Sequence, residues 1–179
     1  MESVKSQRFF AGLIDRQIIL AVLFAALIVA PRSFMIARAH SETYDVPYHL
    51  IRGLAYFTRT ISKKDLSCND PPLGEALIAT PLLVSNLLEG RSADDDRLYD
   101  VPRRAEAIAV RIALWNTVLF LPLVATVFVW LRQLYGVGSA WLAVTLLIIE
   151  PNFATHIPLA TIDVVGVTGI VIACFCIWR

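Results

Sequence analysis

Six ionisable side chains stand out because each lies in, or directly beside, a long apolar stretch of the 179-residue sequence. They are Asp45, His49, Arg111, Glu150, His156 and Asp163. Carboxylates and imidazoles can accept a proton from a nucleophile or bind a metal ion. A guanidinium can bind a phosphate through two parallel hydrogen bonds. Because a charge inside a membrane segment is costly, such residues tend to mark a functional site.

The composition indicates a membrane protein. Hydrophobic residues make up 57% of the chain and charged residues only 17%, against roughly 25% in a typical soluble domain. These values exclude a disordered chain and disfavour an ordinary soluble domain. The net charge of +1 provides no global field for nucleic acid, so nucleic acid is not an expected partner. Three cysteines are too few for a dense disulfide framework.

Four apolar stretches are candidate membrane spans, which need about 20 residues each. They run over about 17–37, 108–131, 134–149 and 157–178. The alternative for the first stretch is a cleaved signal peptide, but the preceding residues 1–16 are long and mixed in charge for one. We therefore predict a single all-α integral membrane domain over residues 1–179, with four transmembrane helices.

Basic residues beside the spans predict the orientation. In a four-span chain, five of them fall on the same side, namely Lys5, Arg8, Arg16, Arg132 and Arg179. That side is expected to be the cytoplasm, which makes the amino terminus cytoplasmic, in the inner (plasma) membrane of a bacterium. The six ionisable side chains then collect at the outer boundary. Asp163, six residues into the fourth span, is expected to lie about 9 Å deep.

Residues from about 38 to 106 form the predicted extracytoplasmic loop between the first two spans. Tyr44–Phe57 has apolar residues at helical spacing, with Arg52 off that face, which predicts an amphipathic helix on the membrane surface. Leu73–Leu88 is also apolar but carries Glu75 and is short for a span. We predict a second interfacial helix there, with entry into the bilayer as the alternative.

Three segments carry motifs. They are Tyr44-Asp45-Val46-Pro47-Tyr48-His49-Leu50, Asn69-Asp70-Pro71-Pro72-Leu73 and the hairpin segment from Pro151 to Asp163. With an arginine opening the second span, this order resembles the N-terminal third of the polyprenyl-phosphate-sugar-dependent glycosyltransferases of the GT-C fold. Protein O-mannosyltransferases and lipid A aminoarabinose transferases are members. The resemblance covers most of residues 8–179, and the hairpin motif is its most specific part. It implies sugar transfer from a polyprenyl-phosphate donor to an acceptor protein or glycolipid on the extracytoplasmic side.

The resemblance also implies roles for individual residues. Asp45 matches the aspartate assigned as the catalytic base, and Arg111 matches an arginine expected to contact phosphate or orient an acid. The implied substrate-binding residues are Arg111, Asp163, His156, His49 and Asp70. A divalent metal is one way to stabilise the leaving phosphate, and Asp70, His156 and Asp163 are its candidate ligands.

The sequence differs from the family pattern at two positions and in its length. Val46 stands where a second acid often follows the base, and Asp70 stands where histidine or lysine is common. Family members have many more spans, so we expect either the N-terminal part of a longer enzyme or a shortened relative, inactive alone. The alternative is an inactive membrane remnant or subunit that binds lipid-linked sugar or a partner protein. A small transporter is disfavoured, because the inner halves of the spans are apolar.

Overall fold

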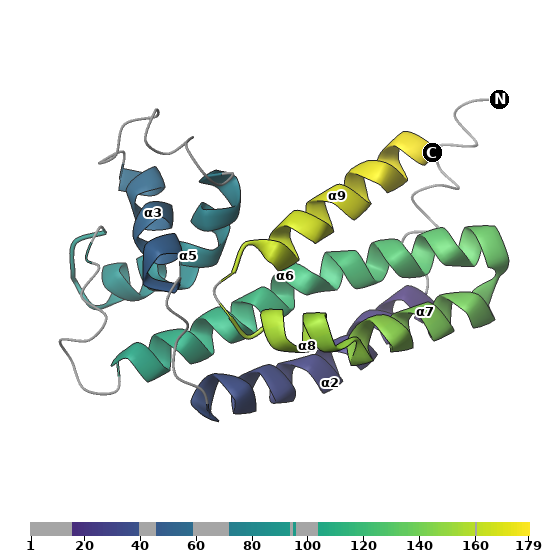
Figure 1. Ribbon diagram of the computed structural model, residues 1–179, viewed down its shortest axis with the longest axis horizontal. Helices are drawn as coiled ribbons and strands as arrows, with labels where there is room; N and C mark the ends of the chain where they lie inside the picture. Colours follow the sequence, from purple (N-terminus) through teal and green to yellow (C-terminus); the bar gives the residue numbers. More distant parts are fainter. Residues whose placement is uncertain (1–15, 40–45, 59–71, 94, 96–103, 160) are drawn as a thin grey trace.

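The computed structural model describes residues 16–39, 46–58, 72–93, 95, 104–159 and 161–179 (Figure 1). Every regular element in these ranges is an α-helix, as the sequence predicts. In chain order the helices are α2 (Arg16–Ala39), α3 (Val46–Thr58), α5 (Pro72–Leu88), α6 (Arg104–Tyr135), α7 (Val137–Ile149), α8 (Pro151–His156) and α9 (Asp163–Trp178).

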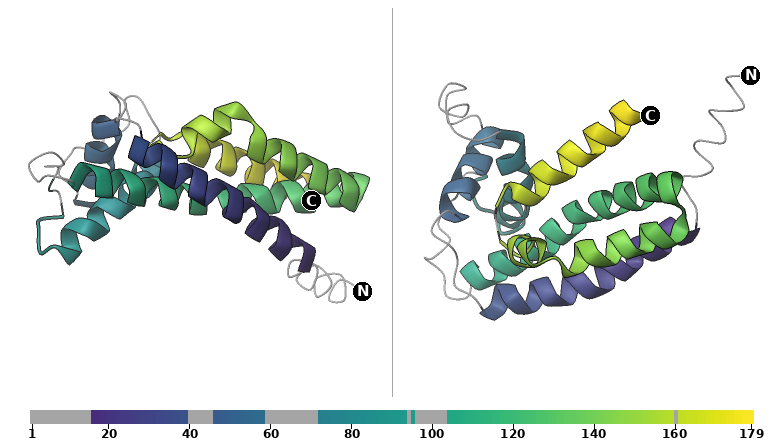
Figure 2. Two further views of the ribbon diagram at one scale, coloured as in Figure 1. Left: turned by 90° about the horizontal axis from the view of Figure 1, so that it is seen from below. Right: turned by 45° about the vertical axis from the view of Figure 1, so that its right-hand side comes forward.

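Four helices form a bundle, defined here as α2, α6, α7 and α9. The helix α6 packs against each of the other three, and consecutive members run in opposite directions (Figures 1 and 2). Gly136 makes the turn from α6 into α7 with a φ of 89°, a conformation that residues with a Cβ rarely adopt. The chain therefore turns at this glycine, and not at residues 132–133 as the predicted span boundaries required.

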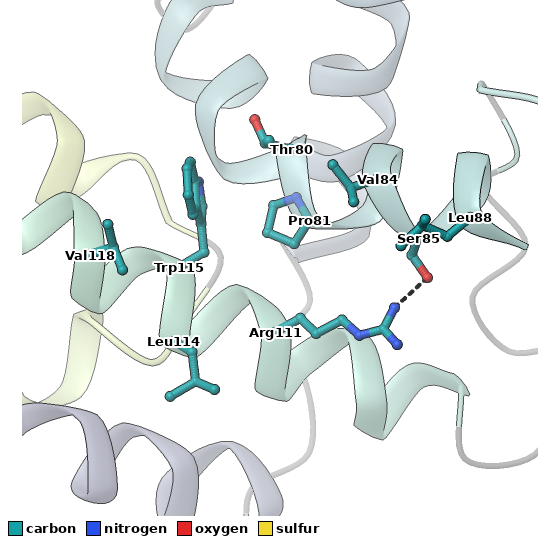
Figure 3. A pocket seen from close by; sticks show the side chains of 9 residues that line it. All are labelled: Thr80, Pro81, Val84, Ser85, Leu88, Arg111, Leu114, Trp115 and Val118. Carbon is teal, nitrogen blue, oxygen red and sulfur yellow. Dashed lines mark hydrogen bonds between the residues drawn. The ribbon is translucent and has the colours of Figure 1, made fainter.

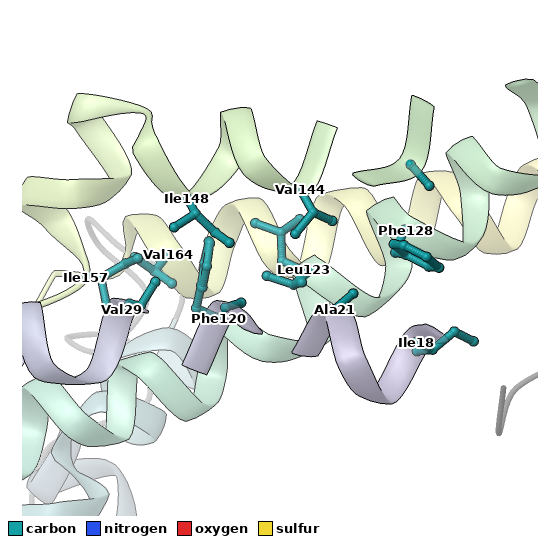
Figure 4. Packing of buried hydrophobic residues seen from close by; sticks show 13 residues of the cluster. Ile18, Ala21, Val29, Phe120, Leu123, Phe128, Val144, Ile148, Ile157 and Val164 are labelled. Carbon is teal, nitrogen blue, oxygen red and sulfur yellow. The ribbon is translucent and has the colours of Figure 1, made fainter. Parts of the chain in front are cut away.

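Small and medium side chains at four-residue spacing make the contacts inside the bundle. On α2 the buried residues include Ala21, Ala25 and Val29, and on α7 they include Ala140 and Val144. Residues four apart share one helix face, and small side chains let two helices approach closely. Figure 4 shows how these side chains meet the larger apolar side chains of α6.

Large apolar side chains cover the outward faces of the bundle. On α2, Leu27 is 75% exposed and Met35 is 68% exposed, and on α7 Leu142 is 61% exposed. Extended apolar surface of this kind marks contact with lipid or with a partner. Both α2 and α6 are long and apolar enough to cross a membrane, and protein covers less than half of either apolar stretch. The other two bundle helices are shorter, with 13 residues in α7 and 16 in α9.

The last helix begins later than the apolar pattern predicts. The predicted span starts at Ile157, whereas α9 starts at Asp163. Residues 157–159, which include Pro158, instead form a turn between α8 and α9. Asp163 is therefore the first residue of α9, with a side chain that is 58% exposed. The helix therefore does not place six residues before Asp163, as the expected depth of about 9 Å assumed.

The helices α3 and α5 pack against each other and against the first turns of α6. Leu50 and Leu54 of α3 and Ile78 and Leu82 of α5 are completely or almost completely buried in this contact. Protein thus covers Leu50 and Leu54 of the apolar face that the sequence pattern predicted to rest on the membrane surface, whereas Ile51 and Phe57 remain 41% and 43% exposed. A helical pattern identifies an apolar face but does not say whether lipid or another helix covers it.

Gly53 allows α3 to lie directly against α5. A Cβ at this position would fall well inside the contact distance of the Glu75 carbonyl oxygen and the Ala79 Cβ. We expect Gly53→Ala to lower the free energy of unfolding by about 1–3 kcal/mol, the usual cost of overpacking. The measurement is the thermal unfolding midpoint in detergent, followed by circular dichroism.

Gly166→Ala on α9 is the matched control, because an added Cβ there meets nothing within 4 Å. Alanine also favours a helix over glycine, so this variant should keep or slightly raise the midpoint. Equal midpoints for the two variants would contradict the close contact between α3 and α5.

Candidate functional site

His156 and Asp163 lie together at the junction between α8 and α9. His156 is the last residue of α8 and Asp163 the first residue of α9, and their Nδ1 and Oδ2 atoms are 2.9 Å apart. Within the described ranges the imidazole Nδ1 makes no aligned hydrogen bond, so this is an ion-pair contact. The side chains are 44% and 58% exposed. An exposed pair adds little stability and remains accessible to a ligand.

Glu150 has a structural role beside this pair. Its Oε2 accepts a hydrogen bond from the backbone N–H of Phe153 at 2.8 Å, and the Asn152 amide donates to its Oε1 at 2.6 Å. The bond from Phe153 lowers the pKa of the Glu150 carboxyl below its usual value. Glu150 is therefore the N-cap of α8 and helps to position His156.

A fully buried carboxylate, Glu75, links α5 to α3. It accepts hydrogen bonds from Arg52 Nε at 2.8 and 3.0 Å, and His49 Nδ1 lies 3.3 Å from its Oε1. The Arg52 side chain is only 9% exposed, and its guanidinium lies 5.2 Å from the centre of the Tyr48 ring. We call His49, Arg52 and Glu75 the Glu75 cluster. A buried carboxylate requires such partners, because an unpaired charge in an apolar interior is very costly.

The sequence reasoning missed the roles of Arg52 and Glu75. It noted Glu75 only as a charge in an apolar stretch, and it placed Arg52 outside the apolar face of its helix. The available signal was the three-residue spacing of His49 and Arg52, which puts both side chains on one side of α3. In the cluster, the carboxylate of Glu75 orients the His49 ring, as a buried acid does for many functional histidines.

Arg111 belongs to a polar network that joins the end of α5 to the start of α6. Its Nη1 donates to Ser85 Oγ at 2.6 Å, and Ser85 Oγ donates to Glu89 Oε1 at 2.6 Å. The bond from Ser85 is the main reason that the pKa of Glu89 is lowered from its usual value. Glu89 also accepts a hydrogen bond from Arg91 and lies 3.5 Å from Arg104 Nε.

An apolar groove lies between α5 and α6, next to this network (Figure 3). Its volume is about 450 Å³, and both helices contribute to its walls. The residues that line it are Thr80, Pro81, Val84, Ser85, Leu88, Arg111, Leu114, Trp115 and Val118. The indole N–H of Trp115 donates to the carbonyl oxygen of Leu77 at 2.8 Å, which fixes this wall of the groove.

The predicted site is only partly assembled in the described residues. His156 meets Asp163, His49 meets Glu75 and Arg111 meets Ser85, so the six side chains do not converge on one point. Arg111 and Asp163 do not pair with each other, because Arg111 contacts Ser85 and Asp163 contacts His156. The elements that carry these contacts, namely α3, α5, the first turns of α6 and the junction between α8 and α9, nevertheless lie towards the same end of the bundle (Figure 1).

Asp45 and Asp70, the predicted base and a predicted substrate or metal residue, lie outside the described residues. Among the residues that are described, no group of three or more His, Cys, Asp or Glu side chains is arranged to hold a metal ion. Of the three candidate metal ligands, His156 and Asp163 are in contact with each other. No protein-family model, curated protein or solved structure matches the chain, so its chemistry has to be inferred from its own side chains.

Removal of the Glu75 carboxylate tests the buried cluster. Glu75→Ala leaves the Arg52 guanidinium buried without its main partner, a change that typically costs about 3–5 kcal/mol. We therefore expect a large fall in the thermal unfolding midpoint in detergent. Replacing both charges, as in Arg52→Met with Glu75→Leu, should restore part of the loss.

Glu106→Ala is the control for this experiment. Glu106 also pairs with an arginine, Arg38, at 3.0 Å, but the two side chains are 47% and 58% exposed. An exposed pair contributes about 0–1 kcal/mol, so the midpoint should hardly change. A Glu75→Ala protein as stable as the Glu106→Ala protein would overturn the assignment of a buried charge pair.

Proposed function

We propose that the chain crosses a membrane four times, with α2, α6, α7 and α9 as the spans and a cytoplasmic amino terminus. The opposite directions of consecutive bundle helices support this topology, as do their apolar outward faces. Arg132 and Arg179, near the ends of α6 and α9, would lie on the cytoplasmic side, where such residues are enriched. The expected location is a bacterial plasma membrane, with residues from about 38 to 106 on the outer side.

Cysteine labelling tests this topology. In a variant without Cys68, Cys174 and Cys176, a single cysteine at Thr155 should react with a membrane-impermeant maleimide in intact spheroplasts. A single cysteine at Ser139, close to the turn after α6, should react only after the membrane is permeabilised. Both positions are exposed in the folded chain. Labelling of both sites from the same side would contradict four spans.

We further propose that the chain contributes the first part of a membrane glycosyltransferase. The complete enzyme would transfer a sugar from a polyprenyl-phosphate donor to an acceptor protein or glycolipid on the extracytoplasmic side. The observation that carries the proposal is the exposed contact of His156 with Asp163 at the end of an otherwise apolar bundle. Charged and accessible groups at the boundary of a membrane domain fit a substrate with a lipid tail and a polar head.

The chemistry assigns different tasks to the polar groups at this end. Asp45, which directly precedes α3 in the sequence, would take the proton from the acceptor hydroxyl or amine. The acceptor atom then bonds to the anomeric carbon, the bond from that carbon to the phosphate oxygen breaks, and polyprenyl phosphate leaves with the electron pair. The Arg111 guanidinium would stabilise the charge on the leaving phosphate.

His156 and Asp163 are suited to holding the substrate or a metal ion. An imidazole and a carboxylate form a common pair of ligands for divalent metals, and Asp70 is the candidate for a third. A charged pair that is more than 40% exposed on both sides can exchange partners with an incoming sugar or phosphate at low cost.

A transfer assay with an Asp45→Asn variant tests the enzymatic proposal. Membranes that contain the chain, expressed with any sequence that follows it in its gene, are incubated with a radiolabelled polyprenyl-phosphate sugar. General base catalysis contributes roughly 10²–10⁴-fold to a rate, so Asp45→Asn should reduce transfer at least about 100-fold at unchanged membrane level. Glu106→Gln, at an exposed acid paired with Arg38, should retain full transfer.

Two outcomes would overturn this proposal. Full activity of the Asp45→Asn variant would exclude Asp45 as the base. Binding of the donor lipid without transfer by the unmodified chain would favour the alternative, an inactive remnant or a subunit that binds lipid-linked sugar.

A further inference from the structure

We propose that the groove between α5 and α6 holds the start of a single isoprenoid chain, with the phosphate of the same lipid bound by Arg111. The inference rests on the proposed function for the identity of the lipid, a polyprenyl phosphate. The proposed lipid site lies on α5 and α6 and does not include His156 or Asp163.

The position of Arg111 along α6 matches the depth of a lipid phosphate. Arg111 and Arg132 bracket a run of 20 residues, Ile112–Leu131, without a charged side chain. The 21 steps between the two arginines correspond to about 32 Å of helix, close to the hydrocarbon thickness of roughly 30 Å. If α6 crosses the bilayer, its two arginines therefore lie at the opposite boundaries, where lipid phosphates are found.

The apolar walls of the groove continue directly into lipid-facing surface. Val84 and Leu88 of α5 are 46% and 81% exposed, and Leu114 and Val118 of α6 are 38% and 51% exposed. A chain that is already in the bilayer can enter such a groove without passing through water. The volume of about 450 Å³ lies within the range of small-molecule sites.

Arg111 is the one charged residue among those that line the groove. Its Nη1 donates to Ser85 Oγ, and within the described residues this is its one hydrogen bond. A guanidinium has five N–H donors, so most of its donors remain free for an anion. Figure 3 shows the side chain running along the groove towards Ser85, which holds the guanidinium at the edge of the apolar walls.

A monophosphate on a single chain complements the groove, which has apolar walls on α5 and α6 and the Arg111 guanidinium held at its edge by Ser85.

Photocrosslinking with a sugar-free lipid tests the site. The purified chain in detergent is irradiated with a polyprenyl phosphate that carries a diazirine near the head of its chain. Crosslinks should map by mass spectrometry to α5 and α6, including Leu114 and Val118. A hydrogen bond to a charged group contributes about 1.5–3 kcal/mol, which is a factor of at least 10 in affinity. Arg111→Gln should therefore weaken binding at least tenfold, whereas Arg132→Gln, at the other end of α6, should not.

Two further variants separate binding from folding. Arg111→Lys keeps the charge and should retain more affinity than Arg111→Gln at the same unfolding midpoint. Val84→Trp fills the groove and should abolish the crosslinks on α6 while Arg111 is intact. Unchanged crosslinking in either Arg111→Gln or Val84→Trp would overturn the site.

Competitors identify the lipid. An unlabelled polyprenyl phosphate should compete, whereas the matching polyprenol, inorganic phosphate and phosphatidylglycerol vesicles should compete at least tenfold less well. Equal competition by the polyprenol would overturn the role of Arg111, and equal competition by phosphatidylglycerol would overturn the choice of a single-chain lipid. Because the probe carries no sugar, crosslinking without sugar transfer would refute the enzymatic proposal alone. Transfer without crosslinking in the groove would refute this site alone.

Discussion

The uncharged run of α6 between Arg111 and Arg132 is the constraint on which the rest of the molecule depends. An apolar helix of this length cannot remain in water, so its surface must be covered by other helices or by lipid. The bundle helices α2, α7 and α9 cover part of it with small side chains, and the outward faces stay apolar. Polar chemistry is thereby confined to the ends of the bundle.

The helices α3 and α5 add polar groups at one of these ends, and they bury Leu50, Leu54, Ile78 and Leu82 in their contact. Their contact depends on Gly53, which allows close approach, and on Glu75, whose buried charge is compensated by Arg52. Because α5 also contacts α6, the same contact that buries the Glu75 carboxylate positions one wall of the groove. The side chain of His49 and the apolar groove are therefore both in contact with the same helix, α5.

Several features follow from local sequence pattern and were predicted correctly. The all-helical character of the described residues and the approximate positions of the bundle helices follow from long apolar runs. The predicted start of α9 at Ile157 was wrong, because residues 157–159 form a turn after α8, and an apolar pattern does not distinguish such a turn from a helix. The contact of Arg32 on α2 with α7, through a hydrogen bond from its Nη1 to the carbonyl oxygen of Ile148 at 3.1 Å, was not predicted.

The sequence by itself determined which residues are apolar, how far they extend and where charges interrupt them, because hydropathy and helical periodicity are local properties. Only the tertiary structure decided which charges meet. Glu75 contacts Arg52 and His49, Asp163 contacts His156, and Arg111 contacts Ser85. Apart from the short link between His156 and Asp163, these partners lie more than 20 residues apart along the chain. Long-range pairing depends on how helices pack, and the same apolar face can be satisfied by lipid or by a neighbouring helix at similar energy.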